Sequence, residues 1–141
     1  MRFLLKFQKE DKVKYISHLD LVRTMQRSIR RAGIPVSFSQ GFNPHPIMSF
    51  ASALAVGVTS QGEYMDIVLE KDMNVDELIQ RLNQALPEGI RILEGGKVSA
   101  SFPSLMSVLE KADYILRFPL RESYALDIDG CVKALMKKES I

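Results

Sequence analysis

Four arginines recur at helical spacing in the first third of the chain. They stand at i, i+4, i+7 and i+8, so a helix presents all of them on one face: Arg23, Arg27, Arg30 and Arg31. The charged turn before them adds two lysines, Lys12 and Lys14. Guanidinium groups form forked contacts with phosphate oxygens. The pattern predicts contact with the phosphate backbone of a nucleic acid; the alternative is a solvated outer helix face without a ligand.

The chain's two histidines are candidates for acid–base chemistry. His18 stands where the same helix begins, and His45 lies in a proline-rich loop. If they converge with Asp20 or Asn43 in a cleft, either can act as a general acid or base. Two histidines leave a metal site short of ligands, so no metal is expected. The favoured alternative is structural, with His18 packed at the helix start and His45 bonded to the backbone of its loop.

A loop over 39–46 is the third candidate. Its two prolines, with one residue between them, stiffen the backbone into an extended or turned form. The residues expected to make contacts are Gly41, Phe42, Asn43, Pro44 and His45. An exposed Phe42 would stack on a base or grip a partner chain; a buried Phe42 would plug the core.

Motifs that define several enzyme classes are absent. The chain has no P-loop, no dinucleotide fingerprint, no nucleophile elbow and no zinc-protease helix. We expect Cys131 to be a buried structural thiol, and Glu63 and Asp66 to lie on the surface. No complete catalytic site is identified and no cofactor is expected, so a binding role is favoured over an enzymatic one.

The bulk properties indicate one globular domain, or one domain and the start of another, in 141 residues. Residues 1–47 carry a net charge of +6 and residues 48–141 a net charge of −4. This asymmetry points to an anionic partner on one face, or to a dipolar surface without a partner. One cysteine excludes an internal disulfide and a self-contained iron–sulfur cluster. The chain has no apolar run of membrane-spanning length and no signal peptide, so a cytoplasmic location and no membrane partner are expected.

Hydrophobic periodicity predicts six elements in the order β-α-β-β-α-β. Ser17 and Asn74 are expected to cap the two helices, and Gly33 to end the first. The expected strands cover 2–8, 48–56, 64–70 and 90–93. The order predicts an α+β fold, a ferredoxin-like split β-α-β sandwich with both helices on one face of an antiparallel sheet.

We therefore expect a ferredoxin-like domain with a basic first helix over 1–97, followed by an extension over 98–141. In the extension, a strand at 114–118 and a helix at 130–138 are expected to form the start of a second β-α unit. That unit would belong to a longer domain.

Three stretches carry a family resemblance: YISHLDLVR at 15–23, GFNPHP at 41–46 and GEYMD at 62–66. Together they resemble the radical-SAM-linked protein family, a bacterial domain of unknown function fused to, or encoded beside, a radical S-adenosylmethionine enzyme. The resemblance covers at least residues 1–95. The chain lacks the three-cysteine cluster motif, so it resembles the stand-alone partner. The candidate positions in these motifs are His18, Asp20, Arg23, Gly41, Asn43, Pro44, His45 and Glu63.

The resemblance implies a radical SAM enzyme as partner. Genes near those of the family encode a ribosomal protein and an RNA-processing ribonuclease, which implies RNA. Three functions stay open: an RNA- or partner-binding module, a protein-docking subunit that binds no nucleic acid, and an RNA-processing enzyme that uses His18 and His45. They are ranked in that order.

Overall fold

The computed structural model describes residues 1–117 and 127–137. The chain divides into two compact units, Met1–Lys111 and Ala112–Ile141. The strands of the first unit are β1 (Arg2–Lys9), β2 (Met48–Phe50), β3 (Ser60–Val68) and β4 (Ile90–Val98). Its helices are η1 (Asp11–Val13), α1 (His18–Arg31), α2 (Val75–Ala85) and α3 (Leu105–Val108).

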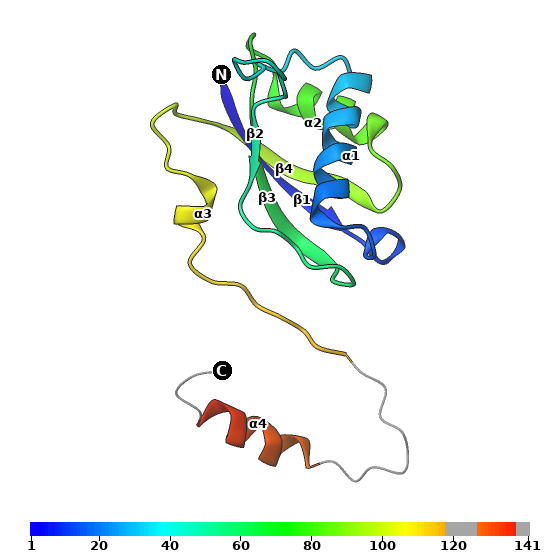
Figure 1. Cartoon of the computed structure of the whole chain (residues 1–141), viewed down its shortest axis with the longest axis vertical. Coiled ribbons are helices and arrows are strands. Elements are labelled where there is room, and N and C mark those ends of the chain that lie inside the picture. Colours follow the sequence, from blue (N-terminus) through cyan, green and yellow to red (C-terminus); the bar gives the residue numbers. More distant parts are fainter. Residues whose placement is uncertain (118–126, 138–141) are drawn as a thin grey trace. The chain divides into compact units, whose positions relative to one another are not determined.

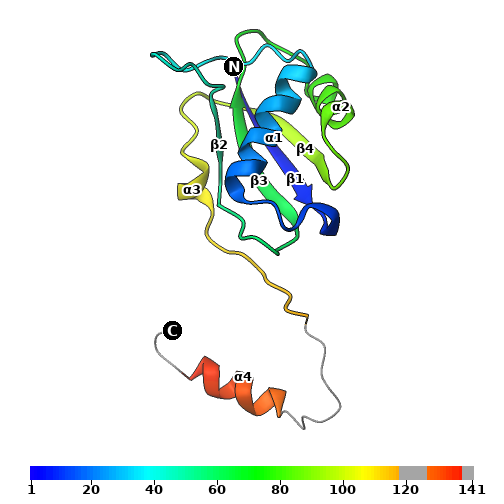
Figure 2. The same ribbon diagram turned by 45° about the vertical axis from the view of Figure 1, so that its right-hand side comes forward.

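The first unit is an α+β fold built on one antiparallel sheet. Its four strands lie in the order β2-β3-β1-β4. Helices α1 and α2 cover the same face of this sheet (Figures 1 and 2). The predicted antiparallel sheet and the placement of both helices on one face are therefore confirmed.

Alternating side chains of the strands build the core beneath the two helices. In β1, every second residue from Phe3 onward is buried, as the sequence pattern predicts. The helices contribute Leu21, Met25 and Ile29 from α1 and Leu78 and Leu82 from α2. The remaining central residues come mainly from the strands and their flanks: Leu5, Phe7, Met65, Ile67, Leu69, Ile90 and Ile92.

The predicted helix ends are confirmed by their caps. The Ser17 hydroxyl accepts a hydrogen bond from the Asp20 amide at 3.1 Å, and the Asn74 side chain accepts one from the Asp76 amide at 2.8 Å. Gly33 ends α1 with a φ of +60°, a conformation that side-chain-bearing residues avoid.

The bounds of all four strands differ from the prediction: β1 extends one residue further, to Lys9, and β3 covers Ser60–Val68 where 64–70 was expected. β2 is shorter than expected because only Met48–Phe50 pair with β3. β4 continues through Gly95 and Gly96 to Val98, beyond the expected end at residue 93. A Cβ on Gly95 would lie 2.7 Å from Leu5 Cδ2, so a larger residue there would require the buried Leu5 side chain to shift.

The second unit contains α4 (Ile128–Met136), which overlaps the helix expected at 130–138 as far as residues are described. The strand expected at 114–118 is wrong over 114–117, and Phe118 lies outside the described residues. Among the described residues, no strand pairs with 114–117 to provide a hydrogen-bond ladder, and Tyr114, Ile115 and Leu116 are exposed. Cys131 is exposed as well, so the expectation of a buried thiol is wrong. None of the helices in the described ranges has the length and apolar character to cross a bilayer.

Candidate nucleic-acid interface

Helix α1 presents arginines to solvent along its outer side. Arg23, Arg27 and Arg30 are exposed, whereas Met25 and Ile29 on the opposite side are buried. The three exposed residues, which we call the arginine face, span about 10 Å at a rise of 1.5 Å per residue. Their placement follows from helical spacing alone, as the sequence predicted.

Asp20 is the one acid of α1, and it lies beside the first residue of the arginine face. Its Oδ1 is 3.4 Å from Nη1 of Arg23, a loose pair with more than half of each side chain exposed. The Ser17 hydroxyl donates to the other carboxylate oxygen at 2.7 Å. This hydrogen bond, followed by the charge of Arg23, lowers the pKa of Asp20, so its carboxylate is a fixed negative neighbour of Arg23.

Arg31 has a different role from the arginine face. Its guanidinium donates to the Ala85 carbonyl, the last of α2, at 2.6 Å, and to the Ser28 hydroxyl at 3.1 Å. Arg81 of α2 reciprocates by donating to the carbonyls of Ala32, at 2.7 Å, and Gly33, at 2.8 Å. Each arginine thus satisfies carbonyls at the negative C-terminal end of the other helix. Arg31 is exposed, but its guanidinium is engaged in joining the two helices.

The two lysines expected to extend the basic face are bound to local carboxylates. Lys12 forms an ion pair with Glu88. Lys14 Nζ lies 2.7 Å from Asp11 Oδ1, and this hydrogen bond raises the pKa of Lys14. Both lysines are therefore partly neutralised, unlike Arg27 and Arg30.

The loop over 39–46 is closed by its own hydrogen bonds. An isolated antiparallel bridge joins Phe38 and Pro46 at its base. One step further, the Ser39 amide donates to the His45 carbonyl at 2.9 Å, and the Ser39 hydroxyl lies 2.9 Å from His45 Nδ1. Figure 2 shows this segment, in teal, extending away from the sheet beside β2.

Phe42 stands in this loop with its side chain in solvent. Its relative exposure is 107%, so the alternative of a core plug is wrong. Gly41, before it, has a φ of +136°, which favours glycine. Asn43 and Pro44, after it, are exposed. A small, self-closed loop therefore presents one aromatic ring.

The two histidines are not brought together. His18 packs edge-on against Phe50 of β2, with ring centroids 5.3 Å apart. His45 lies beyond the other end of β2, five residues from Phe50, which corresponds to about 16 Å of extended chain. Asp20 is exposed on α1 and bonded to Ser17. This separation gives the acid–base hypothesis no shared site in the described part of the chain.

Lys9 is a buried cation, one residue beyond the predicted end of the first strand. It is 1% exposed, and its ammonium donates to the carbonyls of Lys14, at 3.0 Å, and Ile16, at 3.4 Å. Burial lowers the pKa of Lys9, while the charge of Glu63 acts in the opposite direction. The alternation of β1 continues to Lys9 and could have revealed its burial. Through these bonds Lys9 holds the turn that leads into α1.

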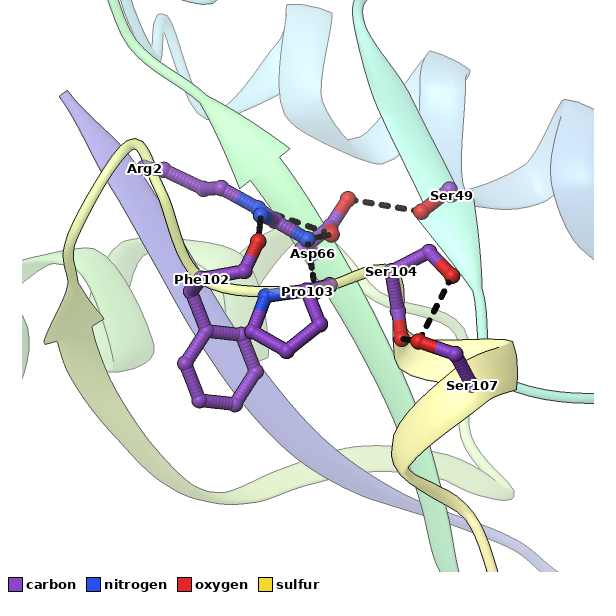
Figure 3. A network of polar contacts seen from close by, with 7 residues as sticks. All are labelled: Arg2, Ser49, Asp66, Phe102, Pro103, Ser104 and Ser107. Atoms are coloured by element: carbon purple, nitrogen blue, oxygen red, sulfur yellow. Dashed lines mark hydrogen bonds and ion pairs between the residues drawn. The ribbon is translucent and has the colours of Figure 1, made fainter.

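Asp66 is a second buried ionic residue, on the sheet face away from the helices. It is 6% exposed, so the expected surface position is wrong. Arg2 forms an ion pair with its carboxylate, and the Ser49 hydroxyl donates to it at 2.8 Å (Figure 3). Arg2 also donates to the carbonyls of Phe102 and Pro103, which ties the segment after β4 to the sheet. Arg2 and Lys9 therefore stabilise the fold, since their partners are protein groups.

Within residues 1–117 and 127–137, no three histidine, cysteine, aspartate or glutamate side chains gather in a way that could hold a metal ion. The candidate site is therefore described by two features, the arginine face and the loop that carries Phe42.

The fold and these features define a small α+β domain with a basic helix and an aromatic-tipped loop. Its sequence matches the model of a family described as an uncharacterized protein conserved in bacteria (DUF2344), over residues 2–141. The chain belongs to this family. No curated protein matches it.

Proposed function

We propose that the chain is an accessory module that binds RNA by contacting phosphate groups with the arginine face, and that it acts with a radical SAM enzyme. One observation carries the RNA part. Arg23, Arg27 and Arg30 are exposed on a stretch, residues 21–62, that contains no aspartate or glutamate. Asp20 lies beside Arg23 at the start of α1, but α1 has no acid beside Arg27 or Arg30. A cationic surface with few carboxylates attracts a polyanion.

Among the described residues, the side chains of the arginine face form no bond between elements of the fold, in contrast to Lys9, Arg2 and Arg31. Arg23 has only the loose contact with Asp20. Side chains that do not stabilise the fold are available to a ligand, and the forked guanidinium suits phosphate oxygens.

We infer further that the sheet is ferredoxin-like. The strand order β2-β3-β1-β4 and the alternation of strands and helices along the chain support this inference. Other domains of this architecture bind RNA, which is an argument from analogy only.

The RNA part is tested by fluorescence anisotropy with a short single-stranded oligoribonucleotide. The triple variant Arg23→Ala/Arg27→Ala/Arg30→Ala is expected to bind on the order of 50-fold more weakly at 0.15 M salt, because three phosphate contacts and their released counterions are lost. The matched control is Lys71→Ala/Arg91→Ala/Lys111→Ala, which removes the same charge from exposed positions outside α1. An equal loss in both variants would reduce the effect to net charge and contradict the arginine face.

The partner is tested by affinity capture of the chain from a bacterial lysate, with and without ribonuclease. Recovery of a radical SAM enzyme together with RNA supports the proposal. Recovery of the enzyme without enriched RNA, insensitive to ribonuclease, would instead favour the protein-docking alternative. Capture with the triple variant distinguishes RNA binding from protein docking, because only the recovery of RNA should depend on the arginine face.

A further inference from the structure

The loop that carries Phe42 offers a contact that the arginine face does not supply. We propose that Phe42 stacks on an unpaired base, so that the module binds single-stranded RNA in preference to duplex RNA. The proposal rests on the proposed function and names the class of RNA that the same module would bind.

The ring of Phe42 is open to solvent on an ordered loop. Phe42 is fully exposed, yet the loop around it is closed by the Phe38–Pro46 bridge and by the hydrogen bonds between Ser39 and His45. A base–aromatic stack needs an open ring face on a support that is already ordered, since ordering a floppy loop would cost binding free energy. The backbone next to the ring is equally open, because a Cβ on Gly41 would meet nothing within 4 Å.

The residues beside Phe42 also suit contact with a base. The neighbours of Phe42 in the chain are small or neutral and polar: Gln40, Gly41 and Asn43. Anchors of protein–protein interfaces are usually surrounded by other contacts that exclude water, and these immediate neighbours in the chain supply no such apolar ring. Asn43 can bond a base edge with its amide.

The stretch of chain that contains Phe42 also lacks negative charge. The nearest acids along the chain are Asp20 and Glu63, so the loop and most of α1 lie within one carboxylate-free stretch. The phosphate attached to a stacked base would therefore meet no acid from this stretch. An acidic protein surface would satisfy the arginines equally well but would not require an exposed aromatic ring in the loop, so charge and aromaticity together favour the nucleic acid.

The test compares two strands in the same anisotropy assay, an oligoribonucleotide and the same strand with abasic sugars. Phe42→Ala is expected to lower affinity for the strand with bases about tenfold and to leave affinity for the abasic strand unchanged. Phe42→Tyr should retain the affinity. Tyr15→Ala removes an exposed aromatic elsewhere on the same unit and should change neither value. Thermal unfolding checks that Phe42→Ala folds, as its full exposure predicts.

Wild-type preference for single-stranded over duplex RNA, abolished by Phe42→Ala, supports the proposal. Equal binding of the two strands by the wild type, with loss of both only in the triple arginine variant, overturns the stacking role and leaves the phosphate-binding function intact. Binding of neither strand refutes both. A Phe42→Ala variant that binds RNA normally but no longer captures a radical SAM enzyme would overturn base stacking in favour of a protein contact.

Discussion

Helices α1 and α2 lie on the same face of the sheet and make the same kind of contact with each other, but they differ in what they present to solvent. Arg31 of α1 bonds the end of α2, and Arg81 of α2 bonds the end of α1. Beyond this exchange, α2 carries Asp76 and Glu77, and Glu77 pairs with Arg81 at 3.2 Å. Helix α1 instead carries the three residues of the arginine face.

The difference separates two uses of arginine within one helix. Arg30 and Arg31 are adjacent in the chain and both are exposed, but only Arg31 has carbonyl partners on α2. A charge that the fold employs contributes to stability, whereas a charge that the fold leaves unbound is available for function. Substitutions at neighbouring positions should therefore affect different measurements.

The largest effect on stability is expected when the hydrogen bonds of Arg31 and Arg81 between α1 and α2 are removed. Arg81→Ala should lower the free energy of unfolding by about 2 kcal/mol, because the carbonyls at the end of α1 lose a charged donor. Arg31→Ala should have a smaller effect in the same direction, since that side chain is more exposed. Urea denaturation measures both, with Arg91→Ala as the control. Unchanged stability in Arg81→Ala would show that the contacts are incidental.

A smaller effect, on binding alone, is expected at the neighbouring position. Arg30→Ala should leave the free energy of unfolding within about 0.5 kcal/mol of the wild type. Its RNA affinity should fall about fourfold at 0.15 M salt, the share of one phosphate contact. Arg31→Ala, compared at a temperature where it is fully folded, should bind RNA like the wild type. If Arg31→Ala lost more affinity than Arg30→Ala, the division between the two arginines would be wrong.

The smallest effect is expected on the pH dependence of stability, through Asp20 in α1 and Asp72 before α2. A hydrogen bond from Ser17 lowers the pKa of Asp20 in α1, and one from Lys97 lowers the pKa of Asp72 before α2. Both carboxyls bind protons more tightly in the unfolded chain, so their stabilising contribution is present above the ordinary pKa and is lost as pH falls below about 4. Asp20→Asn/Asp72→Asn should therefore flatten the acid limb of stability against pH. An unchanged slope would contradict these assignments.

Local features of the fold were predictable from the sequence, because their causes are local. Ser17, Gly33 and Asn74 set the helix ends through bonds or backbone angles within a few residues. The exposure of Arg23, Arg27 and Arg30 follows from helical spacing. The exposure of Phe42 did not follow, because an aromatic residue in a loop can turn toward the core or toward solvent, and helical or strand spacing does not apply there.

The residues whose surroundings were predicted wrongly have partners that are distant in the chain. Asp66 is buried because Arg2, 64 residues away, pairs with it across the sheet. Arg31 meets a carbonyl 54 residues away. Spacing tells which side of an element a residue occupies, but not which group lies opposite. Lys9 is the exception, since its place in the alternation of β1 already indicated burial.

The salt dependence of RNA affinity tests the central claim most directly, because it counts the phosphate contacts of the arginine face. Affinities of the wild type and of the triple variant Arg23→Ala/Arg27→Ala/Arg30→Ala would be measured across a range of salt concentrations. We predict that the slope of log affinity against log salt is shallower in the variant by about 2, the value for three contacts on a single strand. Parallel slopes for the two proteins would contradict the claim that these arginines bind phosphate.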